Sequence, residues 1–215
     1  MSAARTAAAH RGLRRFRAPA PAPPERCELC GTELVDRHRH LVDTRNRALA
    51  CACPHCALLF ERPGAGGGQF RTVPDRYLTD PGHRLDDALW DRLQIPVGVA
   101  FLLDNTALGR MVALYPSPAG ATESELDPAA RQSVRDATRL AGLLAPDVEA
   151  LLLHRTPGRT DCHLIPVDRA YELTGRLRTV WRGFDGGAEA RAALAEFFTE
   201  VAGRAREPRE EDRRP

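Results

Sequence analysis

Four cysteines in two matched pairs are the strongest chemical signature of this 215-residue sequence. The pairs are Cys27-x-x-Cys30 and Cys53-x-x-Cys56, and 22 residues separate them. Two residues between cysteines allow a tight turn to direct both sulfurs toward one point, and two such turns supply the tetrahedral ligand set that zinc prefers. The spacing therefore predicts one metal ion bound by Cys27, Cys30, Cys53 and Cys56.

Zinc is the ion that we expect at this site, and iron is the alternative. A tetrahedral set of four thiolates accommodates either metal, and the two cysteine loops also resemble those of a rubredoxin. The segment between Cys27 and Cys56 contains no Phe, Tyr or Trp, so the aromatic residues of a rubredoxin core are missing from it. Zinc is therefore favoured. The odd number of cysteines in the cluster, together with the lack of an export signal, argues against a disulfide framework.

Three further metal-binding side chains lie in the same stretch, namely Cys51, His38 and His40. Strand alternation puts both histidines on one face, and a two-residue turn at Arg45-Asn46 places His40 opposite Cys51. A register shift of one residue would separate them. The three side chains could supply an additional ligand set or a redox-active thiol beside an imidazole. They could equally be a small buried thiol and two surface histidines.

The segment between the cysteine pairs has the pattern of a β-hairpin. We expect strands at Glu33–Val42 and Arg47–Ala52, joined at residues 44–46. The hairpin and the cysteine turns together form a zinc-ribbon-like module over residues 25–62. A module this small buries too little apolar surface to fold unaided, whereas a structural zinc contributes about 10–16 kcal/mol of apparent binding energy. We therefore expect the metal to act as the core of the module.

The rest of the chain divides by composition. Residues 1–24 contain five arginines, no acidic residue and a Pro-rich end, which predicts a disordered basic arm. Residues 63–94 are expected to form a linker and a short amphipathic helix. Residues 206–215 are predicted to be a disordered charged tail.

Residues 95–205 have the patterns of a larger domain. Strand-like segments at 97–103 and 110–115 are followed by a helix from Asp127-Pro128 to about Leu144. Two more strands, at 148–154 and 162–167, precede a helix capped by Asp168 and a last helix at 188–204. This order predicts an α+β fold in which an antiparallel sheet packs against helices.

Composition and motifs exclude several functions. Every basic residue in the count of 31 Lys and Arg is arginine, which excludes lysine Schiff-base chemistry and the Walker P-loop. The net charge of +2 comes from the arm, whose +5 leaves −3 on the remainder, so charge argues against a nucleic-acid surface on the body. No segment approaches 18 consecutive apolar residues. We therefore expect a cytoplasmic protein without a membrane span.

Catalytic signatures are missing as well. The sequence contains no GxSxG, HExxH, GxGxxG or EF-hand pattern, so we expect a non-enzymatic protein. His154, Cys162 and His163 flank one predicted turn and could form a thiol-imidazole pair. A buried structural thiol at Cys162 is the interpretation that we favour.

A set of phrases adds a resemblance to a known family. The phrases are CELCGTEL, HRHLVD, CACPHCALLF, IPVGVAFLL, YPSPAGATES, APDVEALLLHR, IPVDRAYEL and WRGFDGG. Together, over about residues 25–205, they resemble an uncharacterised actinobacterial family filed as a domain of unknown function, whose members are often encoded beside uptake [NiFe]-hydrogenase genes. The resemblance implies an accessory role in hydrogenase assembly, electron delivery or regulation, with a hydrogenase subunit or maturation factor as protein partner. The first hypothesis is therefore a metal-stabilised interaction protein, and the second is a rubredoxin-like electron carrier with iron in the same four thiolates. The third is a zinc-ribbon regulator that binds nucleic acid, based on the arm and the arginines of the hairpin.

Overall fold

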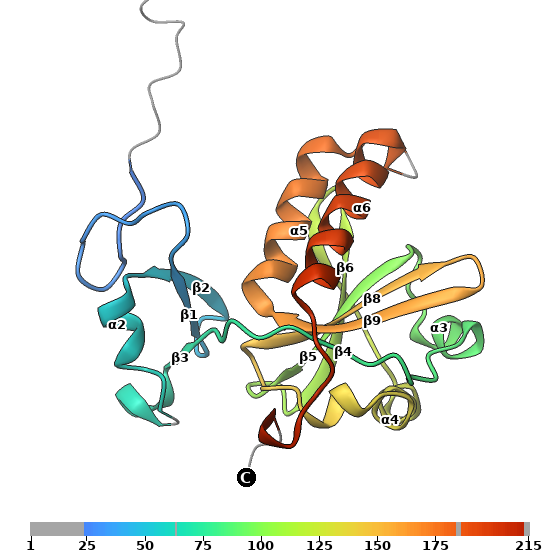
Figure 1. The fold of residues 1–215 in the computed structure, drawn as a ribbon, viewed down its shortest axis with the longest axis horizontal. Coiled ribbons are helices and arrows are strands. Elements are labelled where there is room, and N and C mark those ends of the chain that lie inside the picture. The colour runs from blue at the N-terminus through green and yellow to red at the C-terminus, as the bar shows by residue number, and fades with distance from the viewer. Residues whose placement is uncertain (1–23, 63, 184–185, 213–215) are drawn as a thin grey trace, which may run out of the picture.

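The computed structural model describes residues 24–62, 64–183 and 186–212. Within these residues the chain forms two antiparallel sheets and five α-helices (Figure 1). The smaller sheet has the strand order β2-β1-β3, and the larger has the order β4-β9-β8-β5-β6-β7. The predicted α+β class is confirmed.

The small sheet contains the predicted hairpin. It consists of β1 (Arg39–Asp43), β2 (Ala48–Ala52) and β3 (Phe70–Thr72). The carboxylate of Asp43 accepts hydrogen bonds from the backbone N–H groups of Arg45 and Asn46, both at 3.0 Å, and this side-chain turn closes the hairpin. The first strand begins at Arg39 rather than Glu33. The third strand lies in the predicted linker.

The six-stranded sheet carries helices on both faces (Figure 1). Its strands are β4 (Leu78–Thr79), β5 (Val99–Asn105), β6 (Arg110–Ser117), β7 (Gly120–Ser124), β8 (Glu149–Thr156) and β9 (Arg159–Pro166). The helices on its faces are α3 (Asp87–Leu93), α4 (Pro128–Ala137), α5 (Val167–Val180) and α6 (Gly187–Arg204), whereas α2 (Pro54–Leu58) lies beside the small sheet. Short 3-10 turns are η1 (Ala65–Gly68), η2 (Arg139–Gly142) and η3 (Glu210–Asp212).

Strand β5 shows how one sheet supports two helical layers. Phe101 and Leu103 pack in the core that includes residues of α5 and α6. Ala100 and Leu102 point to the opposite face, where they join residues of α3, α4 and η2. Because successive side chains of a strand alternate between faces, a strand buried on both sides is apolar at nearly every position.

The small sheet packs on the larger domain instead of standing alone. Val42 of β1 and Val73, directly after β3, belong to the same core cluster as α5 and α6, and Leu49 of β2 packs against it. On its other face, Leu41, Ala50 and other apolar residues form a small cluster with two of the cysteines. The hairpin therefore has apolar support that the sequence did not reveal.

Several predicted boundaries differ from the structure. Helix α3 begins at Asp87, since Asp86 caps it, and β4 occupies the start of the predicted amphipathic run. Helix α4 ends at Ala137 because Thr138 is extended at φ −145°, and η2 continues the chain. Asp168 does not cap α5, whose N-cap residue is Pro166.

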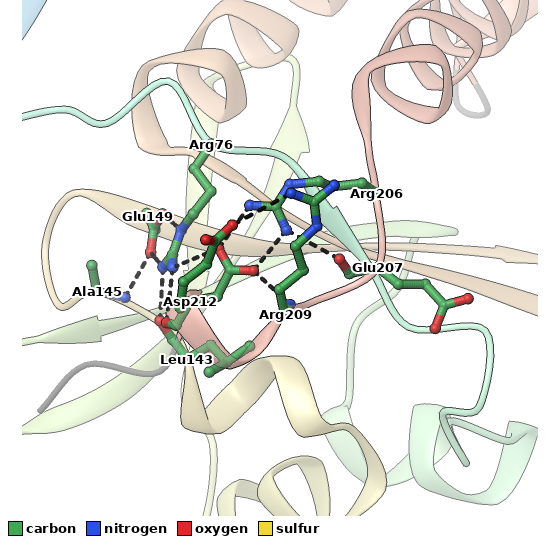
Figure 2. Close-up of polar contacts among 9 residues, drawn as sticks. Arg76, Leu143, Ala145, Glu149, Arg206, Glu207, Arg209 and Asp212 are labelled. Atoms are coloured by element: carbon green, nitrogen blue, oxygen red, sulfur yellow. Dashed lines mark hydrogen bonds and ion pairs between the residues drawn. The ribbon is translucent and has the colours of Figure 1, made fainter.

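Residues 206–212, which belong to the tail that the sequence predicts to be disordered, make defined contacts in the structure. Arg206 forms a two-pronged ion pair with the buried carboxylate of Asp212, at 2.6 and 2.9 Å. Figure 2 shows that Arg76 joins this pair to Glu149, which is fully buried. Charge-rich composition predicted disorder because the partners of these charges are distant in sequence. Residues 213–215 and nearly all of the predicted arm, residues 1–23, lie outside the described residues.

Along the described part of the chain, no helix combines the length and the hydrophobicity that a bilayer crossing requires.

Candidate metal centre

The structure brings the four predicted cysteines together. The sulfur atoms of Cys27, Cys30, Cys53 and Cys56 all lie within 4.8 Å of one another, and the Sγ atoms of Cys30 and Cys53 are 3.8 Å apart. A zinc–sulfur bond of about 2.3 Å in a tetrahedral site requires about 3.8 Å between sulfurs, whereas a disulfide requires about 2.05 Å. The sulfur spacing therefore suits one metal ion bound by all four cysteines and does not suit a disulfide.

The first cysteine turn follows from its local sequence. The Gly31 N–H donates to the Cys27 carbonyl at 2.8 Å, and the Cys27 N–H donates to the Thr32 carbonyl at 2.8 Å. Gly31 has φ +75°, a left-handed conformation that glycine adopts without steric cost. The chain thus reverses directly after Cys30 and turns both sulfurs inward.

The second cysteine turn is the start of helix α2. Cys53 is the N-cap residue, Pro54 occupies the first turn, and the Cys53 sulfur accepts a hydrogen bond from the Cys56 N–H at 3.5 Å. Proline suits this position because the first N–H groups of a helix have no internal partner. One short helix therefore presents both sulfurs of the second pair.

The electrostatics of the cluster favour a cation. Burial raises the pKa of the Cys27 thiol, but hydrogen bonds to backbone groups of Cys53, Cys30 and Leu29 outweigh it and lower the pKa to about 6. The hydrogen bond with Cys53 raises the pKa of the Cys56 thiol to about 12. Four sulfurs this close cannot all be thiolates without a compensating positive charge.

Two aromatic rings pack beside the cluster. Phe60 and Phe70 form an edge-to-face pair with centroids 5.4 Å apart and contact the apolar group that contains Cys27 and Cys53. Both rings come after the second cysteine pair. Aromatic rings therefore do accompany the four cysteines, and their lack between the two pairs does not separate zinc from iron.

The three additional side chains also converge. The register pairs His40 with Cys51 as predicted, and ligand atoms of His38, His40 and Cys51 lie within 4.8 Å of one another. The two imidazole centroids are 4.7 Å apart. Burial is the main cause that raises the pKa of the Cys51 thiol, which disfavours the free thiolate of a redox-active cysteine.

Asp168 belongs to this second cluster, and the sequence reasoning did not assign it there. Its Oδ2 atom lies 2.8 Å from Nδ1 of His40. The two residues are 128 positions apart in the chain, so no local pattern could have joined them. The contact links the small sheet to the first turn of α5.

The candidate pair around Cys162 does not form. In the β8–β9 register Cys162 pairs with Leu153 and His163 with Leu152, so the thiol and the imidazole point to opposite faces. Both His154 and His163 contact the Phe198 ring. Burial raises the pKa of the Cys162 thiol to about 12. Cys162 is the buried structural thiol that we favoured.

Fold and site together define a protein in which four cysteines that could hold one metal ion lie on a small sheet, and this sheet packs against an α+β domain. The family described as "Family of unknown function (DUF5947)" matches residues 26–205, and the chain belongs to this family. No match was found among the curated proteins or among the solved structures.

Proposed function

We propose that the chain is a non-enzymatic accessory protein in which one zinc ion, bound by Cys27, Cys30, Cys53 and Cys56, fixes the small sheet as a surface for a protein partner. The observation that supports this most is the convergence of the four sulfurs within 4.8 Å. A site whose four positions are all filled by protein ligands is typical of structural zinc, because no position is left for a substrate.

Exposed apolar side chains support a protein partner. Among the described residues, four of the six large hydrophobic side chains that are exposed lie on or beside the cysteine turns, namely Leu29, Val35, Leu58 and Leu59, with exposures of 40, 74, 60 and 66%. Exposed apolar residues that gather on one module are characteristic of interaction surfaces. The metal would hold the turns that carry these residues.

The partner that we propose is a subunit or a maturation factor of a [NiFe]-hydrogenase. This proposal rests on the resemblance of the sequence phrases to a family whose members are often encoded beside uptake hydrogenase genes. A cytoplasmic location belongs to the same proposal, since reducing conditions keep thiols available as metal ligands.

Co-purification tests the partner. Tagged protein from a host that makes the hydrogenase should retain a hydrogenase subunit or maturation factor, and Leu58→Ser with Leu59→Ser should weaken this retention while the metal content stays unchanged. Leu108→Ser is the matched control, because Leu108 is 42% exposed on the turn between β5 and β6. If no such protein is retained and gene deletion leaves hydrogen uptake intact, the hydrogenase role is wrong.

A second candidate is an iron electron carrier that uses the same four thiolates. Cys30 is exposed at the surface, which would give an electron a short path to a partner. Aerobically purified protein decides between the two. A colourless sample with stoichiometric zinc excludes the carrier, whereas visible thiolate-to-iron absorption that bleaches on reduction excludes structural zinc.

A further inference from the structure

A second group of ligands lies on the face of the hairpin that packs toward the large domain. His40 shares its strand face with Val42, which joins the core of the large domain, whereas Leu41 packs with the cysteine cluster. We propose that His38, His40 and Cys51 form a second metal site, which binds a zinc-like divalent transition-metal ion through three protein ligands and leaves one coordination position open.

His38 is prepared for metal binding by its tautomer. Its Nδ1 atom lies 3.0 Å from the carbonyl oxygen of Val35, and a carbonyl only accepts, so Nδ1 carries the proton. The other nitrogen, Nε2, therefore has a free lone pair. Nε2 is buried without a hydrogen-bond partner among the described residues, on a side chain only 6% exposed. A buried acceptor without a partner is costly, and a metal ion would satisfy it.

His40 has a second feature of metal-ligating histidines, a carboxylate bound to the ring nitrogen that does not face the metal. Its Nδ1–H donates to Oδ2 of Asp168 at 2.8 Å, which leaves Nε2 as the available ligand atom. A carboxylate that binds the far nitrogen of a metal-ligating histidine fixes the ring and raises its basicity. Asp168 is thus a positioning residue supplied by the large domain.

The spacing of the ligand atoms suits a single ion. Bonds of about 2.0–2.1 Å to nitrogen and 2.3 Å to sulfur in a tetrahedral site separate these ligand atoms by about 3.3–3.6 Å. The atoms of His38, His40 and Cys51 lie within 4.8 Å of one another, so small side-chain rotations would complete the site. Two imidazoles and one thiolate are ligands that zinc, cobalt, nickel and copper all accept.

A groove beside the proposed site could admit a ligand to the fourth coordination position of the metal. A groove of about 950 Å³ runs between the small sheet and the large domain, and its lining includes His38, His40 and Asp168. Three protein ligands with an open position are typical of sites where the metal acts on a bound water or ligand, unlike the closed four-thiolate set. The groove is where such a ligand would enter.

Cobalt(II) titration of the full metal-free chain tests this site. The wild type should bind two ions, and His40→Ala or Cys51→Ser should bind one while keeping the strong thiolate-to-cobalt absorption of the four-cysteine set. His55→Ala is the matched control, because His55 is an exposed histidine of α2 outside both clusters, and it should still bind two. Asp168→Asn should bind two with one affinity reduced 10–100-fold.

The results that overturn the proposal are separate from those that overturn the structural zinc. A wild type with one ion, lost in Cys56→Ser and unchanged in Cys51→Ser, contradicts the second site alone. One ion that survives Cys56→Ser but is lost in Cys51→Ser contradicts the four-cysteine site alone. If His40→Ala does not fold, Asp168→Asn is decisive, and unchanged affinity for both ions would refute the second site.

Discussion

Arg76 is the side chain whose loss should destabilise the large domain most clearly. It binds the fully buried Glu149 through two hydrogen bonds, Nε to Oε1 at 2.8 Å and Nη2 to Oε2 at 2.7 Å (Figure 2). It also donates to the carbonyl oxygens of Leu143 and Asp212. In an Arg76→Met variant the Glu149 carboxylate would keep only the Ala145 N–H, at 2.9 Å, among the partners identified here.

The loss of stability in Arg76→Met follows from the Glu149 carboxylate, which remains buried without its ion-pair partner. Removing one member of a buried ion pair typically costs about 3–5 kcal/mol, because the other charge stays buried without compensation. We therefore expect Arg76→Met to lower the free energy of unfolding by about 3–5 kcal/mol. Adding Glu149→Leu should restore much of this loss, since replacing both members of such a pair by apolar residues is often nearly neutral.

Urea unfolding of the metal-loaded protein, followed by circular dichroism, measures this difference. Arg159→Met is the control, because the Arg159 side chain that pairs with Asp161 is 76% exposed, and its loss should cost less than about 1 kcal/mol. The reasoning is refuted if Arg76→Met and Arg159→Met unfold at the same urea concentration. It is also refuted if the double variant is no more stable than Arg76→Met.

Two further predictions concern the C-terminal segment and the first cysteine turn. Arg206 lowers the pKa of Asp212 from 3.8 to about 2, so the carboxylate stabilises the fold fully above pH 4 and loses this effect as the pH falls toward 2. In urea titrations Asp212→Asn should be less stable than the wild type at pH 6, with a difference that shrinks below pH 3; a pH-independent difference would contradict this. Gly31→Ala should cost about 1–2 kcal/mol of metal-dependent stability, because φ is +75° there although no atom lies within 4 Å of the added Cβ. A zinc affinity equal to that of the wild type would contradict that expectation.

The features that could be predicted from the sequence are local ones. The spacing of the cysteine pairs and the two-residue period of a strand depend only on neighbouring positions, and they placed the four sulfurs together and His40 opposite Cys51. Strands β5 and β8 were predicted from continuous apolar runs, which are also a local signal. These local patterns predict the structure correctly here because the tertiary contacts agree with them.

The features that were missed depend on distant partners. Strands β3 and β4 have three and two residues, too few to show a period, and only their pairing with β1 and β9 defines them. From the sequence, Asp168 is predicted to cap a helix, because its contact with His40 exists only in the folded chain. The tail around Asp212 is predicted to be disordered, because its partner Arg76 lies 136 residues earlier in the chain.

The expected role of the metal also changes in one respect. The sequence suggested that the ion alone would replace a core, but Val42, Leu49 and Val73 pack on the large domain. In the proposed zinc-bound protein, the ion and this packing would therefore share the stabilisation of the small sheet. The ion would stabilise the cysteine turns and the apolar cluster that contains Leu41 and Ala50.

Amide hydrogen exchange on the zinc-loaded wild type and on Cys56→Ser tests the central claim most directly. The account predicts that Cys56→Ser loses protection in β1, β2 and α2 while β8 and β9 remain as protected as in the wild type, because only the small sheet depends on the ion. Equal protection of β1 and β2 in the two proteins would contradict the claim that a metal bound by these four cysteines holds the small sheet.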